Sequence, residues 1–240
     1  MAGIGIKLNK FFDKGTVTGY LAGSGYSVVT TIAPMLLVIA DILAMQKILG
    51  YSDAAYGSRQ LFQATILYIF VFALLASAPL NAVLSRYVSD VIFNETYSDI
   101  MAAFHLGLWI SMAIDAIMVV PFAIHEYIVG GVDIVYVVTS VCCFIALSLV
   151  FYTMLYLSLC KDYGKISLFY FIGMAITLGI SYIFVNKFNM EITYSMLLAM
   201  TIGFIIIASL GYALLRQYFT QNSKNYKDVL QYIVRIRKLI

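Results

Sequence analysis

Charged residues are scarce in this chain. They make up 11% of its 240 residues, and hydrophobic residues make up 62%. A soluble domain is usually about half apolar and about a quarter charged, so this composition excludes a soluble globular fold. The chain is therefore predicted to be a polytopic membrane protein, embedded in the lipid bilayer.

Residues typical of catalytic and metal sites are also few. There are two histidines, which are too sparse for a metal site, and three cysteines. Cys142 and Cys143 lie next to each other in an apolar run, as small hydrophobic residues of a helix do. The sequence has no phosphate-binding glycine loop and no His/Glu zinc motif. We therefore predict that the protein is not an enzyme and that it uses no cofactor, no metal and no nucleic-acid partner.

Long apolar runs dominate what is present. Each run approaches or exceeds the roughly 20 residues that a helix needs to cross the ~30 Å hydrocarbon core of a bilayer. Strand-like alternation of polar and apolar residues is absent, so the predicted fold class is all-α, a polytopic bundle of six transmembrane helices. The runs cover residues 20–49, 61–84, 100–124, 132–159, 166–185 and 192–215.

The placement of positive charge orients these spans. Of the 15 Lys and Arg residues, three (Lys47, Arg59 and Lys187) fall on one predicted side of the membrane, which leaves twelve on the other. Positively charged loops are cytoplasmic as a rule, so both termini are predicted to face the cytoplasm from the cytoplasmic (inner) membrane.

The chain divides into three predicted regions. Residues 1–15 have the pattern of a basic amphipathic helix that lies on the membrane surface. Residues 16–216 form the six-helix bundle. Residues 217–240 are predicted to be a basic cytoplasmic tail, which could also be the start of a second lobe.

The first span is polar on one face. Pro34 and Asp41 are seven residues apart, close to two helical turns, so they share a face. Ser27 and Thr30 join this face at helical spacing. The opposite face is apolar and consists of Ile32, Met35, Leu36, Ile39 and Leu43. A helix of this kind at membrane depth usually turns its polar side away from lipid, so the polar face is predicted to line a cavity.

Two acids lie within apolar runs. Asp41 is in the first run, and Asp115 is in the third, with Ser111 one turn before it. An acid at this depth costs on the order of 3 kcal/mol unless it meets water, a partner or a proton. Each is therefore interpreted either as a cavity-lining or coupling group, or as a protonated, hydrogen-bonded structural acid. Lys47 and Arg59 are possible partners of Asp41.

Other spans carry polar residues at intervals of four. Asn81 belongs to such a stripe in the second span, and Tyr152 belongs to one in the fourth. Hydroxyls, amides and aromatic rings suit a sugar, so these two residues are predicted to line the cavity. The alternative is packing between helices, which is the favoured interpretation for Gly173 and Thr177 in the fifth span.

Three motifs resemble the PelG family, the inner-membrane transporters of the Pel exopolysaccharide system. The opening residues MAGIGI, the basic segment after them and Ala33-Pro34 are similar to the family's N-terminal region. Residues 78–90, APLNAVLSRYVSD, resemble its second-helix exit and include Arg86. Lys161, Asp162 and Tyr163 resemble its loop after the fourth helix. By this resemblance, these four residues belong to motifs in cytoplasmic loops.

The family is part of the multidrug/oligosaccharidyl-lipid/polysaccharide exporter superfamily. The resemblance implies a MATE-like transporter with two six-helix lobes, a central polar cavity and alternating access. This chain would supply the N-terminal lobe and pair with a second lobe or a second copy. The implied partners are other membrane subunits of an exopolysaccharide synthase and a cytoplasmic glycosyltransferase, which makes a cationic, amino-sugar-rich polymer. Such a cargo would suit the negative charges of Asp41 and Asp115.

Two other interpretations of the sequence stay open. The first is an ion-coupled antiporter of the related multidrug type, in which an acid on the first helix is the coupling site. The second is a membrane scaffold that anchors a polysaccharide synthase complex without transporting anything. A departure from the family also bears on transport, because the fourth span reads Phe151-Tyr152-Thr153-Met154 where family members tend to have a tryptophan.

Overall fold

A computed structural model of the chain describes residues 17–94, 96–159, 163–220, 226–227 and 229–231. Side chains are described from residue 32 onward within these ranges, apart from Leu159 and Tyr163. The predicted surface helix over residues 1–15 lies outside the described residues, as does most of the predicted tail over 217–240. Ser27 and Thr30 belong to a described helix, but their side chains lie outside the described set.

Helices form every regular element of the described chain. The short 3-10 helix η1 (Tyr51–Asp53) follows the first long helix. The long helices are α2 (Val17–Ile48), α3 (Tyr56–Phe93), α4 (Asp99–Ile128), α5 (Ile134–Leu159), α6 (Tyr163–Phe188) and α7 (Ile192–Tyr218). Their positions match the six apolar runs of the sequence, and the all-α fold class is confirmed.

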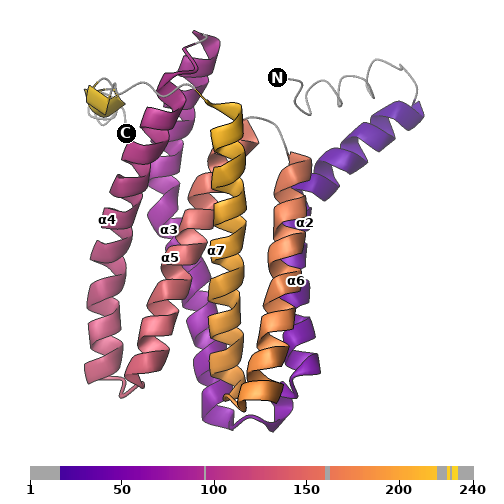
Figure 1. Ribbon diagram of the computed structural model, residues 1–240, viewed down its shortest axis with the longest axis vertical. Helices are drawn as coiled ribbons and strands as arrows, with labels where there is room; N and C mark the ends of the chain where they lie inside the picture. The colour runs from indigo at the N-terminus through magenta and orange to yellow at the C-terminus, as the bar shows by residue number, and fades with distance from the viewer. Residues whose placement is uncertain (1–16, 95, 160–162, 221–225, 228, 232–240) are drawn as a thin grey trace.

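The long helices run up and down through one bundle (Figure 1). Among the described residues, α3 to α7 contain five segments that are long and apolar enough to cross a membrane. α2 is 32 residues long and has Pro34 inside it. It is the helix predicted as the first of six spans, and this sixth crossing stays a prediction.

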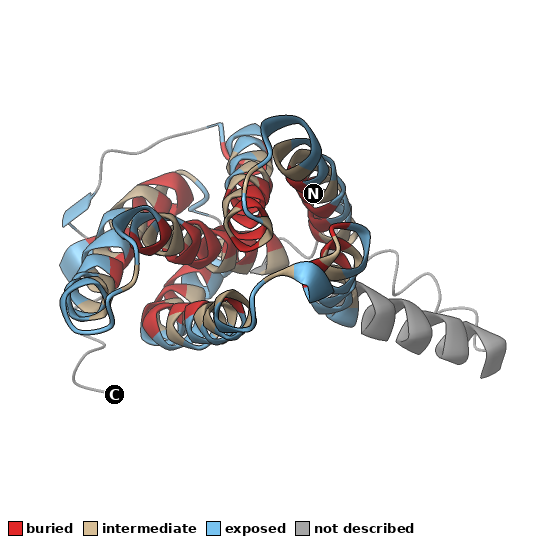
Figure 2. Cartoon of the chain, turned by 90° about the horizontal axis from the view of Figure 1, so that it is seen from below, coloured by how far each residue is buried: buried red, intermediate tan, exposed pale blue. Residues whose placement is uncertain are grey.

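Packing joins the helices into two groups. α5 packs against α3 and α4, and α2 packs against α6. α7 contacts both α5 and α6, so it links the groups. The core lies along α5 and α7, where Tyr152, Leu157 and Phe204 are completely or almost completely buried. Figure 2 shows buried residues facing the interior of the bundle and exposed residues around its outside.

Helix α3 corrects one expectation. Arg86 was expected in a loop, but α3 continues through it and ends only at Phe93. The helix persists because Leu84, Tyr87 and Val91 keep an apolar stripe at helical spacing, and all three are buried. With 38 residues, α3 is about 57 Å long at 1.5 Å per residue, well beyond the ~30 Å membrane core. A helix of this length extends past the hydrocarbon layer on at least one side of the membrane.

Two glycines let α6 and α7 approach closely. A Cβ atom on Gly203 would collide with the Thr177 hydroxyl and lie 3.2 Å from the Gly173 carbonyl oxygen. A Cβ atom on Gly173 would in turn collide with the Ile207 side chain. Thr177 donates a hydrogen bond of 3.0 Å to the Gly173 carbonyl. This is the small-residue contact typical of membrane helices, so Gly173 and Thr177 are packing residues, as the sequence favoured.

Gly203→Ala is expected to lower the free energy of unfolding by about 1–3 kcal/mol, because the new methyl group overpacks the contact with Thr177. Gly179→Ala on α6 is the matched control, since a Cβ atom there meets nothing within 4 Å. Thermal unfolding of both variants in detergent provides the measurement. Equal melting temperatures for the two variants would contradict the close crossing.

Candidate functional site: buried acids and an apolar cavity

Asp41 is buried on the inner face of α2. Its exposed fraction is 3%, and neither carboxyl oxygen has a hydrogen-bond partner among the described residues. The opposite face of the helix is open, with Met35 66% exposed and Leu36 58% exposed. The division of α2 into an exposed apolar side and an inward side that holds the acid is therefore present in the structure. Lys47, one predicted partner of Asp41, is exposed.

Asp115 is enclosed at the contact between α4 and α5. Its exposed fraction is 1%, and Ser111, one turn earlier on the same helix, is also buried. The Ser148 side chain on α5 interacts with the Asp115 carboxyl group. The pair does not meet the distance and angle of a hydrogen bond, however, and within the described part of the chain both groups lack such a partner. Two helices thus bring an acid and a hydroxyl together inside the bundle.

Tyr152 lies inside the packed core. Its ring is fully buried, and its hydroxyl donates a 2.7 Å hydrogen bond to the Phe104 carbonyl oxygen on α4. The same hydroxyl is 3.2 Å from the hydroxyl of Tyr156, one turn further along α5. Gly107 lies beneath it, where a Cβ atom would collide with the tyrosine. In this arrangement Tyr152 joins α4 to α5, and its predicted cavity role has no contact in the structure to support it.

The remaining predicted site residues are spread over the bundle. Asn81 on α3 is half-buried, and its side-chain carbonyl oxygen is buried without a partner in the described set. Pro34 is half-buried within α2. Tyr163 is the first residue of α6, while Lys161 and Asp162 lie outside the described residues. Among described side chains, no three His, Cys, Asp or Glu residues gather closely enough to hold a metal ion.

The structure also contains a cavity that sequence reasoning missed. It has a volume of about 470 Å³ and lies between α3, α4 and α5. Most of its lining is apolar, and neither Asp41 nor Asp115 belongs to it. Tyr68 and Phe72 at i and i+4 on α3 are the sequence signal that could have pointed to it. Aromatic residues in a membrane protein are usually assigned to the interfacial belt instead.

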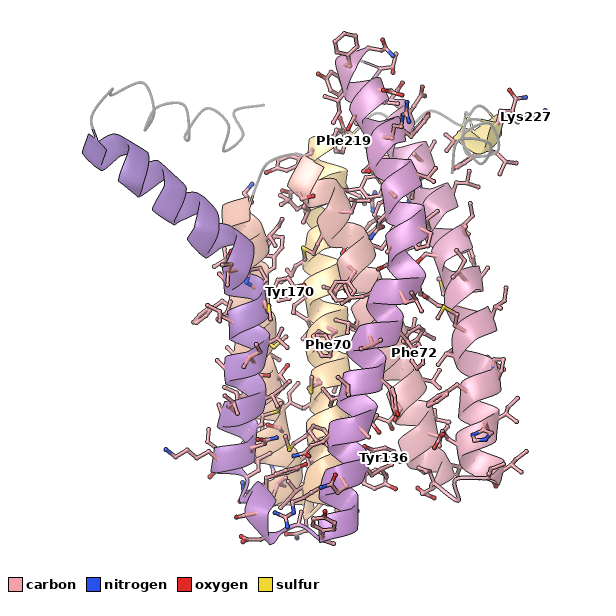
Figure 3. All side chains as sticks on the ribbon, turned by 180° about the vertical axis from the view of Figure 1, so that it is seen from behind. Phe70, Phe72, Tyr136, Tyr170, Phe219 and Lys227 are labelled. Atoms are coloured by element: carbon pink, nitrogen blue, oxygen red, sulfur yellow. The ribbon has the colours of Figure 1, made fainter. Side chains whose placement is uncertain are left out.

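Three aromatic rings line one wall of this cavity. The Phe72 ring centre is 6.0 Å from that of Tyr68 and 5.7 Å from that of Phe122. On the facing helix, Tyr136 donates a 3.3 Å hydrogen bond to the Thr65 hydroxyl. Figure 3 shows Phe72 and Tyr136 on neighbouring helices of the bundle. The only acid in the lining is Glu126, in the last turn of α4.

Taken together, five apolar helices that are each long enough to cross a bilayer define the class of integral membrane proteins. Comparison with known families narrows this class. The chain belongs to the PelG family, whose model matches residues 1–240 and is described as "Putative exopolysaccharide Exporter (EPS-E)". This match confirms the resemblance seen in the sequence, and the family is one of exporters rather than a class of enzymes. No curated protein and no solved structure matches the chain.

Asp115→Asn is expected to leave the free energy of unfolding unchanged or to raise it by about 1 kcal/mol. A buried carboxylate without a hydrogen-bond partner opposes folding, and replacing buried ionic groups by neutral ones is often stabilising. Asp41→Asn should behave in the same way. Asp53→Asn, at an exposed position of η1, is the control and should change stability by less than about 0.5 kcal/mol. Thermal unfolding in detergent measures the stability of all three variants. A large loss of stability in Asp41→Asn or Asp115→Asn would mean that the replaced acid has a stabilising partner.

Proposed function

We propose that this protein moves an exopolysaccharide across the cytoplasmic membrane by alternating access, with its termini on the cytoplasmic side. Membership of an exporter family supports the cargo class. Two acids buried within the spans, each without a hydrogen-bond partner in the described part, support a route for charge through the bilayer. This pair of acids is the observation that carries the proposal.

The buried acids favour a cationic cargo. A carboxylate inside a membrane is costly, and it is retained where a positive group or a proton meets it during the working cycle. A polymer that carries amino sugars has ammonium groups that can pair with these carboxylates. Asp41 and Asp115 would then attract the polymer by charge, while hydroxyl and aromatic side chains contact its sugar rings.

The packing of the helices suits a change between two arrangements. α2 and α6 form one group, α3, α4 and α5 form another, and α7 contacts both. Movement of the first group against the second would carry Asp41 with it and leave Asp115 in place. Domain-scale rearrangements of this kind use interfaces between rigid units while the cores of the units stay packed.

The proposed partners follow from the cargo. A cytoplasmic glycosyltransferase would make the polymer and deliver it to the cytoplasmic end of the bundle. Other membrane subunits of the synthase, and a second lobe or a second copy of the chain, would complete the route. The bundle ends that carry Arg86 and Lys165 would face this glycosyltransferase.

The proposed orientation predicts which loops are accessible from outside. Ser52→Cys, in η1 between α2 and α3, is expected to react with a membrane-impermeant maleimide on intact cells in a cysteine-free background. Thr96→Cys, in the connection between α3 and α4 at the other end of the bundle, is expected to react only after the cells are opened. Both positions are exposed, so burial does not decide the result. Labelling in the reverse order would overturn the orientation.

Replacement of both buried acids tests the export proposal. The variant Asp41→Asn/Asp115→Asn is expected to reduce secreted polymer at least tenfold at equal protein level in the membrane, because the route loses its negative charge. Asp53→Asn should secrete as much as the unaltered protein. Undiminished secretion by the double variant would sink the proposal. Unchanged secretion together with a loss of drug resistance would favour the multidrug-type antiporter instead.

A further inference from the structure

The cavity between α3, α4 and α5 is mostly apolar and extends along about three turns of α3. Its lining extends from Leu61 to Phe72 on α3, and from Val132, two residues before α5, to Phe144 on α5. At 1.5 Å per residue, the stretch on α3 is roughly 16 Å long, running parallel to the helices. One leaflet supplies half of the ~30 Å hydrocarbon core, so this length matches the depth of a single leaflet. A hydrocarbon chain that enters from one face of the membrane would fill it.

The two ends of the cavity differ in polarity. At the inner end the lining residues are apolar, and Phe72 and Phe144 are among them. The outer end lies where α4 finishes and α5 begins, and Glu126 is placed there with its side chain 35% exposed. The Glu126 carboxyl oxygen is 3.5 Å from Nδ1 of His125, which is charged only when protonated. A negative group therefore stands at the mouth of an apolar channel.

We propose that this cavity binds one chain of a phospholipid whose head group carries an ammonium ion, as phosphatidylethanolamine does. The hydrocarbon chain lies between α3, α4 and α5, along the wall formed by Tyr68, Phe72 and Phe122. The ammonium group lies beside Glu126 at the membrane surface. This inference is independent of the exported cargo and assigns the cavity to the surrounding bilayer.

The balance of the lining favours lipid over a sugar as the occupant. Carbohydrate sites need several polar groups to replace water around each hydroxyl, because an unpaired buried polar group is costly. Here the Tyr136 hydroxyl already donates to Thr65, and the Ser140 hydroxyl donates a 2.8 Å hydrogen bond to the Tyr136 carbonyl oxygen. Glu126 at the mouth is the one charged group in the lining. An acyl chain can pack against this apolar lining without forming any hydrogen bond.

The test compares a blocked cavity with a matched surface change. The full chain, purified into nanodiscs of equal parts phosphatidylethanolamine and phosphatidylglycerol, is released and its retained lipids are counted by native mass spectrometry. The unaltered protein is expected to keep one phosphatidylethanolamine. Ala64→Phe, in the cavity lining, is expected to reduce this retention at least fivefold. Ala116→Phe, at an exposed position of α4 outside the cavity lining, should retain the lipid fully.

Two further variants separate the chain from the head group. Val141→Phe blocks the cavity from α5 and repeats the test if Ala64→Phe fails to fold. Glu126→Gln leaves the channel open, so it should keep a lipid but lose the preference for phosphatidylethanolamine over phosphatidylglycerol. Equal lipid retention by the blocked variants and Ala116→Phe would overturn the proposal, as would an unchanged preference in Glu126→Gln. Binding of a glucosamine oligosaccharide that Ala64→Phe abolishes, with lipid retention unaffected, would assign the cavity to the cargo instead.

Discussion

Hydrocarbon cannot accept or donate hydrogen bonds, and the rest of this structure depends on that constraint. Every backbone polar group at membrane depth must find its partner within the protein, which only helices and closed barrels allow. Three buried threonines of the bundle obey the same constraint. Thr177, Thr153 and Thr201 each donate to a backbone carbonyl one turn earlier on their own helix. These residues are polar by type, but their hydroxyl groups are hydrogen-bonded within their own helices.

Contact between helices then depends on shape more than on polarity. Lipid is as apolar as leucine, so helices gain little by hiding apolar side chains from it, and close packing becomes the main source of association. The glycines at the crossing of α6 and α7 permit that closeness, and Tyr152 ties α5 to α4 through one hydrogen bond. α7 holds the two helix groups together, so any movement between them has to be accommodated along its contacts.

Asp41 and Asp115 stand out against this background because they do not follow the pattern of the hydroxyls. Their oxygens have no hydrogen-bond partner among the described residues, and both side chains are almost fully buried. The two acids lie on different helix groups, so one rearrangement can change the surroundings of each separately. The apolar cavity beside α4 has the opposite character, with one acid at its mouth and hydrocarbon-like walls. The bundle therefore has two acids in its interior and, between α3, α4 and α5, an apolar cavity that suits a lipid chain.

Composition and periodicity alone were enough to predict the class of fold, the positions of the long helices and the exposed side of α2. Each of these follows from local composition and from the 3.6-residue period, which need no knowledge of neighbouring helices. The sequence also singled out Asp41 and Asp115, because an acid in an apolar run is visible without any structure. The prediction placed Arg86 in a loop and so ended α3 too early, because charged residues such as Arg86 and Asp90 are typical of loops. The helix continues because Tyr87 and Val91 are buried in the bundle.

What covers each polar face became visible only once the helices were placed against one another. Periodicity places Tyr152 and Asn81 on a face of a helix, but it does not say which helix lies opposite or how closely it approaches. Tyr152 therefore proved to be a packing contact with α4, and the cavity arose from residues on three helices that share no motif. Such features depend on contacts between segments far apart in the chain, and those contacts are set by how side chains of several helices fit together at once.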